Sequence, residues 1–507
     1  RMSKITKQDV VEWANKYLGP ESYAIIYKRE GKDPDEQKIA APKITPIVTN
    51  RDSQSEFLSE IQTSQVQPIE PVFVDYKKDM SQFEAQPGID VLYKKNETND
   101  IFTLIYVFNT GTENDPALNL AFNYLSYLGT DKMTAEEIAS EMYDIACSFY
   151  MNAGANQSSI QITGLSENMG KAMEIVEGLI AGAKPDEAIL ENCKADMLKS
   201  RADAKLNQSR CFGALQRYLF YGGDFIRRTT LTDPALQALT SEQLLAKIGG
   251  LMGKQHEVLY YGPQKEAEVK SALAEHHKVA ADLQPLEKKF STLLPTDANK
   301  VVLAQYDAKQ LYYLQFSNRG EKFDVAADPE ITLYNEYFGG GMNTIVFQEM
   351  REARGLAYTA WATLATPSNA NGDYSYYAFI ATQNDKMQKA VEAFDDIINN
   401  MPESEKAFGI AKEALVSRLR TERTVKDGVL WSYLRARDLG LDAPRDKQIF
   451  EKVQSMTLDD VKAAQQKWVK GRKYVYGILG DIQDLDLNYL KTLGPIQTVS
   501  QEEIFGY

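Results

Sequence analysis

The fold is decided by residues 334–358, which read YNEYFGGGMNTIVFQEMREARGLAY. Three consecutive glycines are expected to end one helix, because glycine accepts positive φ angles and lets two backbones approach closely. Asn343 or Thr344 can cap a second helix, in which Phe347 and Met350 recur at the spacing of a buried helical face. The stretch therefore predicts two helices joined by a tight glycine connection.

The second predicted helix carries Arg351 and Arg354 in its last turn, with Gly355 directly after them. Cations there complement the negative end of the helix dipole, and glycine is a common helix stop. Residues 356–361 then predict an edge or half-buried strand. Arg351 and Tyr358 can converge on one cleft as donors to a peptide carbonyl or a developing oxyanion. The same pair also fits a dipole-matched arginine and a packed tyrosine without any catalytic role.

This motif resembles the signature of the non-zinc domain of M16 (pitrilysin-like) metallopeptidases, the family of pitrilysin, insulin-degrading enzyme and mitochondrial processing peptidase. The resemblance implies a clamshell enzyme in which one half holds the substrate against a zinc site on the other half. Matched by motif, Arg351 orients the substrate backbone and Tyr358 stabilises the tetrahedral oxyanion. The resemblance also implies that the glycines Gly339, Gly340 and Gly341 contact the substrate.

Length and charge narrow the possible functions. A chain of 507 residues is expected to form two or more domains, since single cores rarely grow beyond about 250–300 residues. A net charge of −14 and a pI near 5.0 argue against nucleic acid and anionic membranes as partners, because phosphate binding needs basic patches. No apolar run approaches the roughly 18–20 residues of a membrane span, and three cysteines without CxxC spacing do not predict a disulfide framework.

One pattern recurs three times: a threonine-capped amphipathic helix that runs into a short strand. The copies begin at Thr6, Thr240 and Thr457. Three copies of this domain ending occur, but only two domain beginnings fit. The sequence therefore predicts four segments: 1–30 as the last helix and strand of an upstream M16 domain, 31–70 as an extended linker, 71–290 as a degenerate M16 domain, and 291–507 as a C-terminal M16 domain with the Arg/Tyr motif.

In both large segments, runs of strands come first and helices follow. Strands are expected around 72–74, 89–93, 101–108, 158–162, 301–306, 311–316 and 374–380. Helices are expected around 117–128, 134–146, 168–182, 186–206, 385–399 and 404–424. This order favours an α+β fold with a mainly antiparallel sheet packed by helices. It agrees with two homologous M16-type domains.

The zinc site of the family is missing from the place where the resemblance puts it. M16 zinc domains open with an HxxEH helix that ends in a Gly-Thr pair. Alignment on Gly129 and Thr130 places Leu120, Asn123 and Tyr124 where His, Glu and His should be. Leucine has no lone pair, asparagine cannot act as a general base, and a neutral tyrosine is a poor zinc ligand. The segment 71–290 is therefore interpreted as zinc-less.

The remaining titratable candidates suggest no metal site either. The three histidines are His256, His276 and His277, and no pair has the i,i+3 or i,i+4 spacing of two ligands on one helix face. His276 and His277 are expected at a solvated helix end, and His256 is expected to be structural. Asp395 and Asp396 are expected on an exposed face without a cationic partner. The sequence predicts no metal ligand in this chain.

We interpret the chain as the non-zinc C-terminal half of a pitrilysin-like zinc endopeptidase, which closes a clamshell chamber. Its expected partners are an N-terminal zinc-binding half, on the same precursor or a separate chain, and peptide substrates. Zinc is expected in that other half and no cofactor in this one, so this chain alone should be inactive. The alternative is a non-catalytic M16 peptide-binding or assembly subunit. The resemblance to bacterial pitrilysin-like proteins favours the periplasm.

Overall fold

The computed structural model describes residues 2–19, 21, 23–27 and 55–507, and the chain divides into two compact units, Arg1–Gln67 and Pro68–Tyr507. In the first unit, helix α1 spans Lys7–Tyr17, and Thr6 caps it in a reciprocal pair of hydrogen bonds with Asp9. The short strand predicted after this helix, within residues 1–30, is not found among the described residues. A strand exists only while its backbone bonds to another strand, and the described part of this unit contains none.

The segment 31–70, predicted as an extended linker, contains a helix. Helix α2 spans Glu56–Thr63, and the Ser55 hydroxyl accepts a hydrogen bond from the Leu58 N–H at its start. The helix was missed because its apolar positions fill only two turns. Residues 31–54 of the predicted linker lie outside the described residues.

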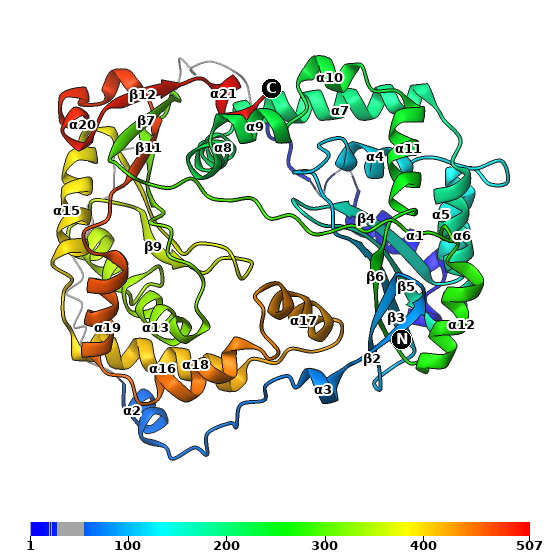
Figure 1. Ribbon diagram of the computed structural model, residues 1–507, viewed down its shortest axis with the longest axis horizontal. Helices are drawn as coiled ribbons and strands as arrows, with labels where there is room; N and C mark the ends of the chain where they lie inside the picture. Colours follow the sequence, from blue (N-terminus) through cyan, green and yellow to red (C-terminus); the bar gives the residue numbers. More distant parts are fainter. Residues whose placement is uncertain (1, 20, 22, 28–54) are drawn as a thin grey trace. The chain divides into compact units, whose positions relative to one another are not determined.

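The second unit contains two six-stranded sheets (Figure 1). The first sheet has the order β1-β2-β6-β3-β5-β4, in which only β2 and β6 are parallel. Its strands are β1 (Ser81–Gln86), β2 (Ile89–Lys95), β3 (Ile101–Phe108), β4 (Cys147–Ala153), β5 (Ser158–Leu165) and β6 (His256–Gly262).

The second sheet repeats this order as β12-β7-β11-β8-β10-β9, with parallel pairs β12-β7 and β7-β11. Its strands are β7 (Lys300–Gln305), β8 (Gln310–Ser317), β9 (Thr359–Ala365), β10 (Ser375–Gln383), β11 (Val475–Gly480) and β12 (Ile496–Val499). Five strands correspond one to one in order and direction of pairing, and only the strands β1 and β12 differ. The predicted α+β class with mainly antiparallel sheets is confirmed.

Helices pack on one face of the first sheet and bury its main core. Alternate strand residues such as Val91, Leu104 and Tyr260 point into this core, as the two-residue period of a strand requires. The helices of this half are α3 (Tyr76–Asp79), α4 (Leu118–Leu125), α5 (Ala135–Asp144), α6 (Met169–Gly182), α7 (Glu187–Lys205), α8 (Gln208–Tyr221), α9 (Gly223–Thr229), α10 (Asp233–Gln237), α11 (Ser241–Leu251) and α12 (Glu266–His276).

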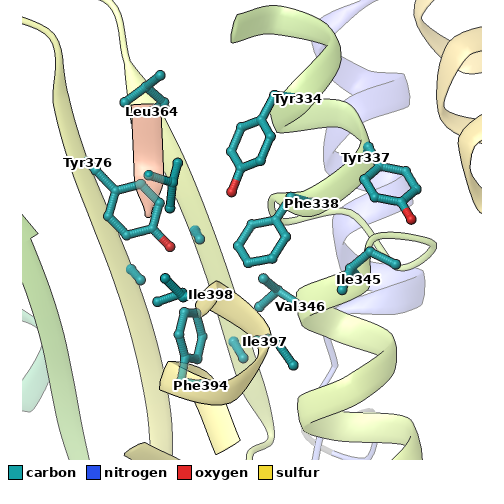
Figure 2. Close-up of a cluster of buried hydrophobic side chains, with 14 of the residues drawn as sticks. Tyr334, Tyr337, Phe338, Ile345, Val346, Leu364, Tyr376, Phe394, Ile397 and Ile398 are labelled. Carbon is teal, nitrogen blue, oxygen red and sulfur yellow. The ribbon is translucent and has the colours of Figure 1, made fainter. Parts of the chain in front are cut away.

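The second sheet buries a matching core under its own helices. Figure 2 shows part of it, in which side chains of α13, α14 and α15 meet those of β9 and β10. The helices are α13 (Asp328–Phe338), α14 (Ile345–Phe347), α15 (Met387–Asn399), α16 (Glu405–Thr421), α17 (Gly428–Asp438), α18 (Arg445–Val453), α19 (Leu458–Ala464), α20 (Leu487–Leu493) and α21 (Gln501–Phe505).

Each half covers the remaining face of the other half's sheet with one helix. Helix α8 packs Leu215 and Leu219 onto the second sheet, so closely that a Cβ added at Gly477 would lie 2.3 Å from the Leu219 side chain. Helix α17 packs Leu430 and Leu434 onto the first sheet. Both helices are labelled in Figure 1. Each sheet is thereby apolar on both faces, and the cluster on its second face includes residues of the other half.

Among the described residues, no helix is both long enough and apolar enough to cross a membrane.

Candidate functional site

The predicted motif lies between helix α13 and strand β9, at the edge of the second sheet. Helix α13 ends at Gly339, whose carbonyl accepts a hydrogen bond from the Ala362 N–H of β9 at 3.3 Å. A Cβ at Gly339 would lie 2.3 Å from the Asn335 carbonyl oxygen and 3.0 Å from that of Ala362. Only glycine therefore lets the helix end against this strand. Gly339 is buried by this packing, whereas Gly340 and Gly341 are exposed.

The helix after the glycines begins where it was predicted but has a different form. Thr344 precedes α14, and its hydroxyl donates to the Gly341 carbonyl at 2.7 Å instead of accepting from a helical N–H. From Gln348 to Ala353 the helix is a π-helix, with a 3.2 Å bond from the Arg354 N–H to the Glu349 carbonyl, five residues back. Met350 is fully buried beneath it.

Gly355 ends this helix in the left-handed region, with a φ angle of 57°. The chain then bonds back to the helix through the Leu356 N–H and the Met350 carbonyl at 2.9 Å, and Tyr358 follows directly before β9. This turn folds the chain so that a side chain from the helix and one from the start of the strand lie on the same side.

The structure brings Arg351 and Tyr358 together. The guanidinium carbon of Arg351 lies 4.9 Å from the centre of the Tyr358 ring and 4.9 Å from the centre of the Phe347 ring. Two aromatic faces therefore hold one cation, an arrangement favoured by the negative potential of each ring face. The Arg351 side chain is 39% exposed and Tyr358 is 71% exposed. Among the described residues, no hydrogen bond to the Tyr358 hydroxyl is found.

Arg351 lies 3.7 Å from a carboxylate oxygen of the adjacent Glu352, whereas Arg354 joins acids of two different elements. It pairs with Glu349 at 3.4 Å and with Asp396 of α15 at 3.1 Å. The prediction that Asp396 has no cationic partner was wrong, because the fold brings helix α15 beside the π-helix. Asp395 is half-buried rather than exposed, accepts a hydrogen bond from the Gln315 amide at 2.9 Å, and has a pKa raised by burial.

The segment that would carry zinc ligands does not fit the metal. Leu120 and Tyr124 of α4 are buried, and Asn123 is exposed. The Tyr124 hydroxyl accepts from the Asp186 N–H at 2.8 Å and lies 2.8 Å from the Ser241 hydroxyl, so it joins three elements of the fold. Among the residues that the structure describes, no group of three or more His, Cys, Asp or Glu side chains is placed to hold a metal ion.

A buried polar network lies in the first half, where the sequence predicted solvent. His277 is 1% exposed, and its Nε2 lies 2.8 Å from Nε2 of His256. Its Nδ1 lies 2.5 Å from a carboxylate oxygen of Glu177 in α6, and Nδ1 of His256 lies 2.8 Å from the Lys254 carbonyl oxygen. The expectation of a solvated His277 was wrong, because residues after α12 turn inward against β6. The spacing of Glu177, His256 and His277 in the sequence does not indicate these contacts.

Comparisons with known proteins agree with this geometry. Residues 255–415, which include the motif, match the family model described as "Peptidase M16 inactive domain". An uncharacterized zinc protease of Rickettsia bellii is 23% identical over 312 residues, which cover 59% of this chain and 70% of that protein.

Two solved structures share the fold. The peptidase M16 inactive domain from Pseudomonas fluorescens has a TM-score of 0.62 and 18% identity, over 79% of this chain and 98% of that one. The periplasmic protease PqqL from Escherichia coli has a TM-score of 0.60 and 13% identity, over 94% of this chain and 51% of PqqL. This chain thus spans about half of PqqL.

The two six-stranded sheets and their helices share the α+β fold of these solved structures. Residues 255–415 match the inactive domain of the peptidase M16 family, which confirms the resemblance inferred from residues 334–358.

Proposed function

We propose that this chain is the non-zinc C-terminal half of a zinc endopeptidase and presents peptide substrates to a zinc-bearing N-terminal half. The observation that carries the proposal is the contact between Arg351 and Tyr358 beside the edge strand β9. The guanidinium carbon of Arg351 lies 4.9 Å from the centre of the Tyr358 ring. Two further features support it: the α4 segment does not fit zinc, and the chain spans 51% of PqqL. In this proposal, 71–290 and 291–507 are two M16-type domains, and a clamshell chamber forms with the other half.

The two side chains would act on different atoms of the substrate. Arg351, held between two rings, would donate to a peptide carbonyl and fix the backbone. The Tyr358 hydroxyl would donate to the oxygen that becomes negative in the tetrahedral intermediate, where a placed donor has its largest effect. When bound in the other half, zinc would supply the activated water. PqqL is a periplasmic protease, which supports the same compartment for this chain.

The test is Tyr358→Phe in the enzyme assembled with its zinc-bearing half. Loss of one oxyanion donor is expected to lower kcat by about 10²–10³-fold while zinc content and complex formation stay unchanged. Tyr143→Phe is the matched control, because Tyr143 is 83% exposed and lies in the first half. This chain alone should show no peptidase activity. An unchanged kcat in the Tyr358 variant would favour the alternative, a non-catalytic peptide-binding or assembly subunit.

A further inference from the structure

Three side chains in the first half form a hydrogen-bonded row that ends on a backbone carbonyl. The row runs from Glu177 through His277 and His256 to the Lys254 oxygen, with distances of 2.5, 2.8 and 2.8 Å. A carbonyl oxygen only accepts, so Nδ1 of His256 must carry a hydrogen. Neutral His256 then has a bare Nε2, and His277 must donate to it from its own Nε2. Neutral His277 is left with a bare Nδ1 facing Glu177.

If Glu177 were ionised, a lone pair on its carboxylate oxygen would face the lone pair on Nδ1 of His277, with the two atoms 2.5 Å apart. One added proton removes the conflict, either on the carboxyl group or on the ring of His277. A second added proton creates a new conflict, because both Nε2 atoms would then carry hydrogens 2.8 Å apart. We infer that Glu177, His277 and His256 form a buried site that binds one proton and keeps it through pH 8.

A metal ion does not fit in place of this proton. Two imidazole nitrogens that share a tetrahedral zinc ion each lie about 2.0–2.1 Å from it, so they stand roughly 3.3 Å apart. The two Nε2 atoms here are 2.8 Å apart. The site therefore has room for a hydrogen and not for a bridging metal.

The surroundings isolate the row from other charges. From β3, the Tyr106 ring lies 4.1 Å from the His277 ring, and burial raises the pKa of Tyr106. The Phe108 ring lies 4.5 Å from that of His256, whose pKa is lowered to about 4 by burial and by His277. From β1, Gln86 donates its amide to the His277 carbonyl.

Other ionisable side chains line a cavity of about 700 Å³ that Glu177 also lines. They are Glu174 of α6, Glu275 and His276 of α12, and Lys278 after it. Glu174 and Glu275 are 67% and 75% exposed, so water screens them. The cavity gives the buried carboxyl group a route for proton exchange.

The sign of the pH effect follows from counting protons. Above about pH 7.5 the unfolded chain carries no proton on these three groups, whose ordinary pKa values are about 4.3 and 6.5. The folded network holds one proton. The contribution of the network to the unfolding constant therefore rises tenfold for each unit by which the pH increases, until the folded network loses that proton. Below about pH 6 the unfolded chain holds two protons on its histidines and the folded network still holds one. The contribution to stability is therefore greatest near pH 6.5.

The Glu177→Gln variant tests the effect of the bound proton on stability while the packing of the row is kept. The glutamine amide can donate to Nδ1 of His277, which satisfies the row without an added proton. The unfolding constant of the natural chain, divided by that of the variant, should rise tenfold per pH unit between pH 6 and 8 in urea titrations. His276→Gln is the matched control, because His276 lines the cavity outside the row. Parallel pH dependences for the natural chain and Glu177→Gln would overturn the inference.

A second measurement needs no variant that alters the row. Nitrogen-15 spectra of the histidine rings, assigned with His276→Gln, should show His256 protonated at Nδ1 and His277 protonated at Nε2 at pH 8. Neither ring should titrate between pH 6 and 8. A midpoint near 6.5 for His277, as in a solvated imidazole, would contradict the proton site.

Discussion

Arg437 of α17 holds the Glu257 carboxylate of β6 through two parallel hydrogen bonds, one of them 2.8 Å long. The hydrogen bonds with Glu257 raise the pKa of Arg437. Glu257 is buried, and the two residues belong to different halves of the chain. This ion pair therefore fixes the helix that one half lays across the sheet of the other, beside the apolar contacts of Leu430 and Leu434.

Arg437→Met should destabilise the protein by about 2 kcal/mol, because a buried carboxylate loses a charged hydrogen-bond partner. Replacing both residues, as Glu257→Met with Arg437→Met, should recover most of that loss, since no buried charge is left. Urea titration of the two single variants and the double variant measures the coupling.

Arg418→Met is the control for that cycle. Arg418 pairs with Glu336, whose side chain is 32% exposed, against 11% for Glu257, so the loss of Arg418 should cost less than about 1 kcal/mol. Equal losses for Arg418→Met and Arg437→Met would show that the pair of Arg437 with Glu257 does not fasten α17 to the first sheet.

Much of this fold could be predicted from local patterns. The β-branched and aromatic runs of β3, β8 and β10 were recognised, as were the long helices α6, α7, α15 and α16. The threonine caps at Thr240 and Thr457 form the expected capping boxes. These features are set by neighbours in sequence, which is why sequence patterns indicate them.

Features that depend on distant contacts were missed. Residues 72–74 were predicted as a strand but have no strand structure. Their apolar side chains serve packing instead: Phe73 packs against the core of the second half, and Val74 packs against the cluster beneath α17. Edge strand β1 is largely polar and was not recognised. The sequence left open whether Arg351 and Tyr358 converge; they do lie together, but the π-helix that precedes their turn was not foreseen.

Gly339→Ala tests whether the close approach of α13 and β9 positions the motif. Its Cβ would meet backbone oxygens at 2.3 and 3.0 Å, so the helix end must shift, at a cost of about 1–3 kcal/mol. We expect a lower melting temperature and, in the assembled enzyme, a lower kcat. Gly341→Ala is the matched control, because its nearest atom would be 3.6 Å away. Equal melting temperatures for the two variants would mean that the backbone adjusts freely at Gly339.

In the proposed enzyme Phe347 would position Arg351, since its ring contacts the Arg351 guanidinium. The Arg351 guanidinium carbon lies as close to the Phe347 ring as to that of Tyr358, and an exposed cation–π contact contributes about 0.5–1 kcal/mol. Phe347→Ala should therefore lower kcat/KM by about 2–5-fold, mainly by raising KM, because Arg351 loses one wall while the Tyr358 hydroxyl stays in place. Phe347→Tyr keeps a ring and should restore KM. Steady-state kinetics of both variants, with zinc content measured alongside, give the comparison. A fall in kcat with unchanged KM, or no rescue by tyrosine, would mean that Phe347 supports the π-helix as a whole rather than the orientation of Arg351.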